Sequence, residues 1–262
     1  MFDFLFYLPL PVTGSAIVGS LCLYAALGLM VVRRLVLPRL RIQEGDAEFS
    51  SGMVQAVMVF YGLALALIAM NVWQTYNNTA QLVSQEAAAI GGLYRDVSGY
   101  PEPARSRLQK ELRDYTDYVI HEAWPLQQRG QIPTGGNENV TRFQNILLDF
   151  EPVTERQKLL HSETLRAFNH TIESRRLRID AAGTQLPGIL WLTIIVGALI
   201  SLGSSFFFKI EDARVHGIQV VLLAAFVGMV IFMVMALDRP FIGDLGLKPD
   251  SYQIVYDHLM KP

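Results

Sequence analysis

This sequence is short of charge and nearly without cysteine. Only 18% of its 262 residues are Asp, Glu, Lys or Arg, whereas a soluble domain carries about a quarter. The formal net charge of -2 supplies no basic face of the kind that binds nucleic acid, so we expect no nucleic-acid partner. The single cysteine, Cys22, excludes a disulfide within the chain. The low charge indicates a chain that lies largely in a lipid bilayer.

The sequence also lacks the motifs that commonly carry enzyme chemistry. It has no phosphate-binding loop ending in Gly-Lys-Ser/Thr, no His-Glu-x-x-His metal motif, no cysteine pair and no Gly-x-Ser-x-Gly nucleophile turn. His161 and His170 are nine residues apart on a predicted helix, which places them on opposite sides of it. We therefore expect no enzyme activity, no bound metal and no cofactor.

What the sequence has instead is a set of long apolar segments. Four windows are long enough to cross a bilayer, and none contains Asp, Glu, Lys, Arg or His. The polar stretch between the second and third windows has helical periodicity, for example Leu108, Leu112, Tyr115 and Val119 on one face. The sequence thus predicts an all-α polytopic membrane protein, with four transmembrane helices in two hairpins that flank a helical extramembrane domain. The four windows are 12–32, 53–72, 186–208 and 217–237.

These windows divide the chain into four parts. We expect a first transmembrane hairpin over 1–73, the extramembrane helical domain over 74–185, a second hairpin over 186–237 and a polar C-terminal tail over 238–262. Within the spans, small residues recur four apart, and such spacing favours close contact between helices in lipid. Examples are Ser15 with Gly19, and Gly197 with Ser201 and Ser205.

The second span is the element around which the rest is organised, because it continues past the membrane boundary to Val97 without a Pro. At alternating steps of four and three, one stripe holds a heptad pattern along this whole helix. Two interpretations stay open. In the first, the membrane part of the stripe lines the central axis of an oligomer, with a polar ring at Gln55. In the second, its small residues pack against the other three spans. The pore-lining candidates are Gln55, Val59, Gly62, Ala66, Ala69, Trp73 and Tyr76; the stripe then runs through Ala80, Val83, Ala87, Ile90, Tyr94 and Val97.

Four charged residues lie where a pore mouth or a gate would be expected. Arg95 lies in the last turn of the second helix and Arg105 follows that helix, and Asp238 and Arg239 follow the fourth span. Arg95 and Arg105 could form an anion-binding ring, but most Arg–carboxylate pairs on helices are structural. Asp238 and Arg239 either gate or simply fix the end of the last span, with Pro240 ending the helix.

The distribution of basic residues suggests an orientation. Both short connectors between paired spans are basic, and the segment before the first span has no Lys or Arg. The positive-inside rule then places both connectors in the cytoplasm, and both termini and the helical domain outside. The basic connector residues are Arg33, Arg34, Arg39 and Arg41, with Lys209 and Arg214 in the second connector.

Several short patches together resemble a known family. They are Glu86-Ala87-Ala88-Ala89 leading to Leu93-Tyr94-Arg95-Asp96, then Tyr100-Pro101-Glu102 with Arg105, then Glu122-Ala123-Trp124-Pro125, and Asp238-Arg239-Pro240-Phe241-Ile242-Gly243. On two membrane hairpins around a helical insert, these patches resemble the uncharacterised bestrophin-like membrane proteins. The resemblance covers nearly the whole chain, and Asp-Arg-Pro-Phe-x-Gly is its most specific motif.

The resemblance implies a function. Bestrophins are pentameric anion channels whose second span lines the pore and whose insert lies in the cytosol, which is opposite to the orientation that the charges favour. The expected partners are therefore the lipid bilayer, further copies of this chain in a homo-oligomer, a pentamer by analogy, and small inorganic ions. We expect an ion channel for small anions, in a multi-pass protein of the bacterial inner membrane. The alternative is a non-conducting membrane scaffold or sensor whose helical domain binds a partner.

Overall fold

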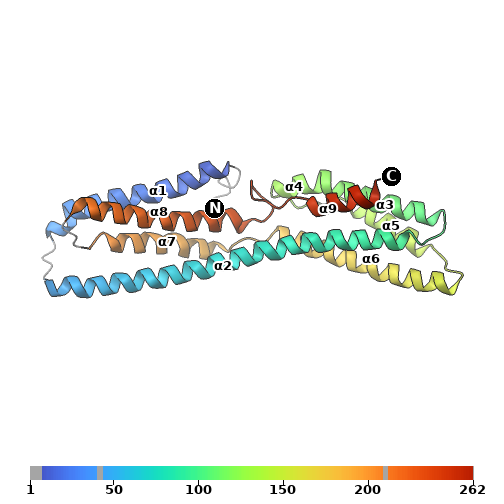
Figure 1. Ribbon diagram of the computed structural model, residues 1–262, viewed down its shortest axis with the longest axis horizontal. Helices are drawn as coiled ribbons and strands as arrows, with labels where there is room; N and C mark the ends of the chain where they lie inside the picture. Colours follow the sequence, from blue (N-terminus) through green and yellow to red (C-terminus); the bar gives the residue numbers. More distant parts are fainter. Residues whose placement is uncertain (1–7, 40–43, 209–211, 262) are drawn as a thin grey trace. The chain divides into compact units, whose positions relative to one another are not determined.

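A computed structural model describes residues 8–39, 44–208 and 212–261, apart from the side chains of 44–51 (Figure 1). The described residues are helical and contain no strand, so the predicted all-α class is confirmed. Arg41 and Lys209, which contribute to the charge pattern of the connectors, lie outside the described residues. The helices are α1 (Leu10–Val31), α2 (Glu44–Val97), α3 (Ala104–Tyr118), α4 (Trp124–Gln128), α5 (Asn137–Leu148), α6 (Glu155–Ala182), α7 (Gly188–Ser205), α8 (Ala213–Asp238) and α9 (Asp250–Val255).

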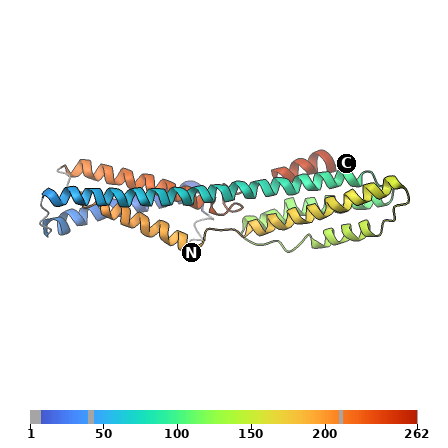
Figure 2. The same cartoon turned by 90° about the horizontal axis from the view of Figure 1, so that it is seen from below.

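Four of the described helices are long and apolar enough to cross a membrane. They cover Leu10–Arg39, Gly52–Val97, Gly188–Ser205 and Ala213–Asp238. Three of them contain a window predicted from the sequence, and Gly188–Ser205 lies within the predicted window 186–208. The chain is therefore a multi-pass membrane protein, as predicted. The second of these helices, α2, runs without a break to Val97 (Figure 2).

The chain divides into two compact units, and we call the first the membrane unit. It comprises Met1–Gln74 and Gln185–Asp238, and so contains α1, the first part of α2, α7 and α8. Close contact between α1 and α8 depends on Gly228, where an added Cβ would lie 3.0 Å from the Cα of Val18. A cluster of buried side chains joins α1, α7 and α8. It consists of Ala25, Leu29, Leu202, Phe206, Val220 and Ala224.

Small residues on α7 allow close packing, as their spacing predicts. Gly197 lies against the ring of Tyr61, where a Cβ would approach Cδ2 and Cε2 to 2.5 Å, and the hydroxyl of Tyr61 donates to the carbonyl oxygen of Ile194 at 3.1 Å. Ser201 and Ser205 are also buried. The small residues on α1 differ, because Ser15 and Gly19 are exposed and take no part in packing within the chain.

We call the second compact body the helical unit; it comprises Thr75–Thr184 and Arg239–Pro262. Its core is formed by one face of α2 together with α3, α5 and α6, and the predicted apolar positions on α3 are all buried. The rings of Phe143 on α5 and Phe168 on α6 stack with centroids 5.2 Å apart. A capping box between Thr154 and Gln157 begins α6, because each side chain accepts from the other's backbone N–H.

The C-terminal segment differs from the polar tail that the sequence led us to expect. Residues Arg239–Pro262 belong to the helical unit, and Phe241, Tyr252 and Met260 are almost completely buried in its core. Gly91 of α2 lies in contact with the other end of this segment, since its Cβ would be 3.5 Å from Val255 and Leu259. The segment is thus a structural part of the unit.

Candidate functional site

The structure separates the predicted pore-lining stripe on α2 into an exposed part and a buried part. Gln55, Val59, Gly62 and Ala66 are exposed, whereas Ala69 is turned inward and only 9% exposed. Trp73 is half-exposed, and the hydroxyl of Tyr76 donates to the carbonyl oxygen of Leu245 at 3.0 Å within the helical unit. Farther along, the stripe lies in the hydrophobic core, at Val83, Ala87, Ile90, Tyr94 and Val97. The single stripe therefore does not face one environment along its length.

Gly62 and Ala66 lie beside other helices of the same chain. With Leu65 they line an apolar hollow between α2, α7 and α8 in the membrane unit, together with residues such as Ser201 and Val227. An added Cβ at Gly62 would meet nothing within 4 Å. The small side chains at these positions therefore leave space beside the chain's own helices.

A different stripe of α2 is exposed along its whole length, and we call it the outer stripe. Its members alternate between steps of three and four residues, except for two successive steps of four at Leu63, Leu67 and Asn71. The stripe changes from apolar to amide side chains at Asn71, near the end of the apolar span. No charged residue lies on it before Arg95 in the last turn of the helix. In the membrane unit it comprises Met53, Ala56, Phe60, Leu63, Leu67, Asn71 and Gln74, and in the helical unit Asn78, Gln81, Gln85, Ala88, Gly92 and Arg95.

The structure places the predicted mouth residues in different surroundings. Arg95 is exposed on the last turn of α2. Arg105 forms an exposed ion pair with Glu102 at 2.7 Å, and the pKa of Glu102 is held below its usual range by the hydrogen bond from Ser106 and then by Arg105. Such an exposed pair contributes little to stability.

Asp238 has a structural position at the end of α8. Its carboxylate accepts a hydrogen bond from the backbone N–H of Leu186 at 2.6 Å and another from the indole N–H of Trp191 at 3.3 Å. The side chain is only 6% exposed. Asp238 thus ties the end of the last span to the beginning of α7. Arg239, the next residue, is partly buried in the helical unit.

The most elaborate polar cluster in the helical unit is one that the sequence did not reveal. The guanidinium of Arg178 on α6 donates to Glu86 on α2, with Nε 2.5 Å from Oε2, and both side chains are almost fully buried. Arg178 also donates from Nη1 to Oε1 of Gln127 at 2.9 Å, and the hydroxyl of Tyr115 donates to Glu86 at 2.7 Å. The two buried charges therefore neutralise one another within a hydrogen-bonded network.

Burial and the charge of Glu86 oppose one another at Arg178 and act in the same direction at the two tyrosines. Burial disfavours the charged form of Arg178, but the carboxylate of Glu86 outweighs it, and the pKa of Arg178 is raised. Burial and then the charge of Glu86 raise the pKa of Tyr115 well above its usual value, and the same two causes raise the pKa of Tyr252. Arg178, Tyr115 and Tyr252 consequently keep one protonation state over the physiological pH range.

The patches that carry the family resemblance meet around this cluster. The ring of Trp124 packs edge-on against Phe241 at 5.4 Å and Tyr252 at 5.7 Å, and its indole N–H donates to the carbonyl oxygen of Leu247 at 2.9 Å. The guanidinium of Arg178 lies 6.0 Å from the Trp124 ring, within the range of a cation–π contact. Three patches far apart in the sequence, those of Glu86, Trp124 and Phe241, thus surround one buried arginine.

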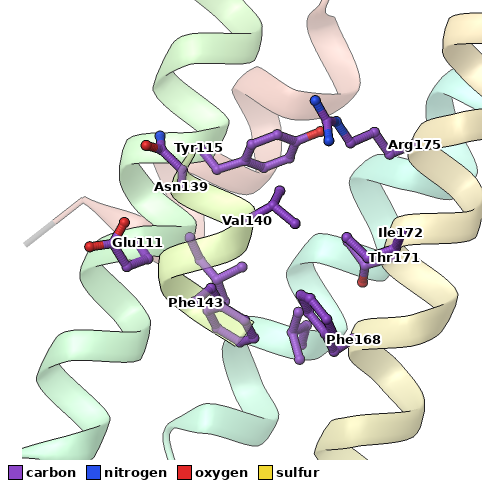
Figure 3. A pocket seen from close by; sticks show the side chains of 11 residues that line it. Glu111, Tyr115, Asn139, Val140, Phe143, Phe168, Thr171, Ile172 and Arg175 are labelled. Carbon is purple, nitrogen blue, oxygen red and sulfur yellow. The ribbon is translucent and has the colours of Figure 1, made fainter. Parts of the chain in front are cut away.

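A small apolar pocket lies beside this network, between α2, α3, α5 and α6 (Figure 3). Figure 3 shows Tyr115 and Arg175 extending toward one another on one side of it, and Phe143 and Phe168 on another. The guanidinium carbon of Arg175 is 5.5 Å from the centroid of the Tyr115 ring, and its Nη2 donates to the carbonyl oxygen of Gly135 at 3.1 Å. The surface that the pocket exposes is apolar, although Glu111, Asn139, Thr171 and Arg175 are among the residues around it.

No group of His, Cys, Asp and Glu among the described residues could hold a metal ion. His161 instead interacts with Tyr100, whose hydroxyl lies 2.9 Å from its Nδ1, and with the ring of Phe150 at 5.7 Å. Burial lowers the pKa of His161, and burial followed by the charge of Glu163 raises the pKa of nearby Asp96.

Comparison with known proteins identifies one family. The family model of the bestrophin-like domain matches residues 20–252, and so covers most of the chain, including every patch named above. No curated protein and no solved structure matches the chain.

Proposed function

This chain belongs to the bestrophin-like family, and from that membership we propose that it forms a homo-oligomeric membrane channel for small anions, with α2 of each subunit lining the central axis. The observation that carries the proposal is the outer stripe of α2. It is exposed, free of charge through the span, and borne by a membrane helix that continues far beyond the span. The proposal assigns no catalytic reaction to the chain.

Within the span, the outer stripe has the composition of a hydrophobic constriction. Phe60, Leu63 and Leu67 are 72%, 58% and 65% exposed in the single chain. Rings of such side chains around an axis control permeation by excluding water when the bore narrows. The amides that follow at Asn71 and Gln74 supply uncharged hydrogen-bonding groups at the end of the constriction.

The outer stripe is a better candidate for the axis than the stripe through Gln55, Gly62 and Ala66. Gly62 and Ala66 border the hollow beside α7 and α8 of their own chain, whereas Phe60 and Leu67 project away from the membrane unit. The two choices make opposite predictions for chemical labelling. Residues that face a water-filled axis react with aqueous thiol reagents, and residues that face lipid or protein are protected.

The experiment therefore combines an assembly measurement with a labelling measurement. Single cysteines at Phe60, Leu67, Gly62 and Ala66 are introduced on a Cys22→Ala background. Native mass spectrometry of the detergent-purified protein gives the number of subunits, and anion flux into liposomes gives the activity before and after labelling.

We expect a closed ring of at least four subunits, and a block of flux by reagent at Phe60 and Leu67. Block only at Gly62 and Ala66 would move the axis to the other stripe. A monomer or dimer without anion flux would contradict the channel and favour the non-conducting scaffold or sensor.

A further inference from the structure

The outer stripe continues in the helical unit as a row of uncharged side chains, which we call the amide stripe: Asn78, Gln81, Gln85, Ala88 and Gly92. All five are exposed. They are spaced alternately by three and four residues, which is the spacing of a coiled-coil seam. The stripe is held outward because the opposite side of α2, at Thr79, Val83, Glu86 and Ile90, is buried in the core of the unit.

The amide stripe is unusual for a helix face in contact with water. Between Thr75 and Tyr94 the only charged residue is Glu86, and it is buried against Arg178. Exposed faces elsewhere in the same unit carry ion pairs instead, such as Glu163 with Arg166 on α6 at 2.8 Å and Lys110 with Asp114 on α3 at 2.6 Å. Solvated surfaces ordinarily carry interspersed charges of both signs, so the face of α2 that lacks them calls for another explanation.

Gly92 adds an independent observation. A Cβ there would meet nothing within 4 Å, so no contact within the chain requires a glycine. Glycine weakens a helix interior relative to alanine. Its presence at the exposed seam, four residues beyond Ala88, is consistent with the close approach of a backbone from outside the chain.

We propose that the amide stripe is the surface through which copies of this chain associate, side by side around a common axis. Side chains that lie at the central axis of a ring approach the same side chains of the other copies, so a charge there would meet like charges, whereas an amide both donates and accepts hydrogen bonds and is complementary to itself. The stripe therefore matches a second copy of itself. This inference rests on the proposed function and deepens it, because it names the contact that joins the subunits outside the membrane.

Cross-linking tests the contact directly. On a Cys22→Ala background, Gln81→Cys and Gln85→Cys are compared with Gln144→Cys, which replaces an exposed amide on α5. Bismaleimides of graded length are applied to the full-length protein in its membrane. We expect Gln81→Cys and Gln85→Cys to give covalent dimers and higher species, at several times the yield of Gln144→Cys. Equal yields at all three positions would overturn the inference.

Charge substitution tests the self-complementarity. Gln81→Glu and Gln81→Lys each place like charges around the axis, and we expect the concentration at which the oligomer dissociates to rise roughly tenfold or more. Gln144→Glu is the matched control and leaves dissociation unchanged. We expect co-expression of the Gln81→Glu and Gln81→Lys variants, each with its own affinity tag, to restore oligomers that contain both variants. Full-strength assembly of each single-charge variant would contradict the inference.

The two proposals fail in distinguishable ways. Flux in liposomes together with unaltered assembly of the charge variants would leave the channel standing and place the subunit contact elsewhere. Cross-linking through Gln81 in an assembly that conducts no anions would leave the contact standing and remove the channel.

Discussion

At the scale of single residues, the helical unit depends on a buried charge that is balanced by one partner. Glu86 and Arg178 come from helices that are far apart in the sequence, and each would be strongly destabilising without the other. The aromatic side chains of Trp124, Tyr252 and Tyr115 close the cluster from three other segments. The ion pair joins α2 to α6, and Tyr252 of the C-terminal segment packs against the same guanidinium.

The first prediction removes one partner of this pair. Arg178→Met leaves the carboxylate of Glu86 buried and uncompensated, and we expect it to destabilise the protein by about 3–5 kcal/mol. The double variant Glu86→Gln with Arg178→Met removes both charges and recovers part of the loss. Thermal unfolding of the detergent-purified protein, followed by tryptophan fluorescence, measures both. A single variant as stable as the wild type would show that the pair does not hold the unit together.

Asp238 supports a second prediction. Asp238→Ala leaves the backbone N–H of Leu186 and the indole N–H of Trp191 without their carboxylate acceptor, and an unpaired buried donor costs about 1–3 kcal/mol. Asp238→Asn keeps an acceptor oxygen and is expected to lose less. The yield of folded protein and the unfolding temperature check the order wild type, Asn, Ala. If the Ala variant assembles normally but its anion flux changes, the gating interpretation is preferred over anchoring.

His161 makes stability depend on pH. Its pKa is lowered in the folded state by burial, so the unfolded state binds more protons below the ordinary value of 6.5, and stability falls as pH drops through that value. The raised pKa of Asp96 acts in the opposite sense at more acidic pH, because the folded state then binds a proton more readily. Between pH 7 and 6, where His161 dominates, we expect the unfolding temperature to fall less in His161→Asn than in the wild type. His170→Asn, at an exposed position on the same helix, is the control; a change of the same size there would contradict the assignment to His161.

At the scale of elements, α2 shows what a sequence pattern predicts and what it leaves open. The absence of Pro and the unbroken heptad predicted one helix to Val97, and the structure confirms it. The pattern did not reveal which of the two stripes lies outside, because a helix that is apolar on several sides gives no signal for the face that its own chain covers. Only the burial of Val83, Ile90 and Val97 distinguishes them.

The buried network was missed for a similar reason. Arginines in a polar helix are ordinarily solvated, and Arg178 stands among Arg175, Arg176 and Asp180 in the sequence. One signal was present, because Glu86 falls beside Val83, Ala87 and Ile90 on the apolar face of α2 and so required a buried partner. Its identity depends on tertiary contacts between segments 92 residues apart, which periodicity does not encode.

The packing of α1 on α8 supports a prediction for the membrane unit. Gly228→Leu would force a side chain against the backbone of Val18, where even a Cβ has only 3.0 Å. Overpacking of this kind costs about 1–3 kcal/mol. Gly217→Leu is the matched control on the same helix, because a Cβ there meets nothing within 4 Å. Unfolding temperatures in detergent measure the difference, and equal effects of the two substitutions would exclude the close approach of the helices.

At the scale of the whole molecule, the number of spans decides which parts of the chain share a side of the membrane. With four spans, the helical unit and both termini lie on one side and the two short connectors on the other. Arg33, Arg34 and Arg39 in the first connector and Arg214 in the second favour the cytoplasm for the connectors. The analogy with bestrophins places the insert in the cytosol instead, so the two arguments give opposite orientations.

The charge pattern predicts that the helical unit faces away from the cytoplasm. Reporters that are active only outside the cytoplasm, or only inside it, are inserted after Ile132, which is 63% exposed in the loop before α5, and at Asp212 in the second connector. We expect the external reporter to be active at Ile132 and the cytoplasmic reporter at Asp212. The reverse result at both sites would establish the bestrophin orientation and show that the basic residues of the connectors do not determine the topology. Activity of the same reporter at both sites would contradict the four-span arrangement itself, because the single crossing by α7 between Ile132 and Asp212 places them on opposite sides of the membrane.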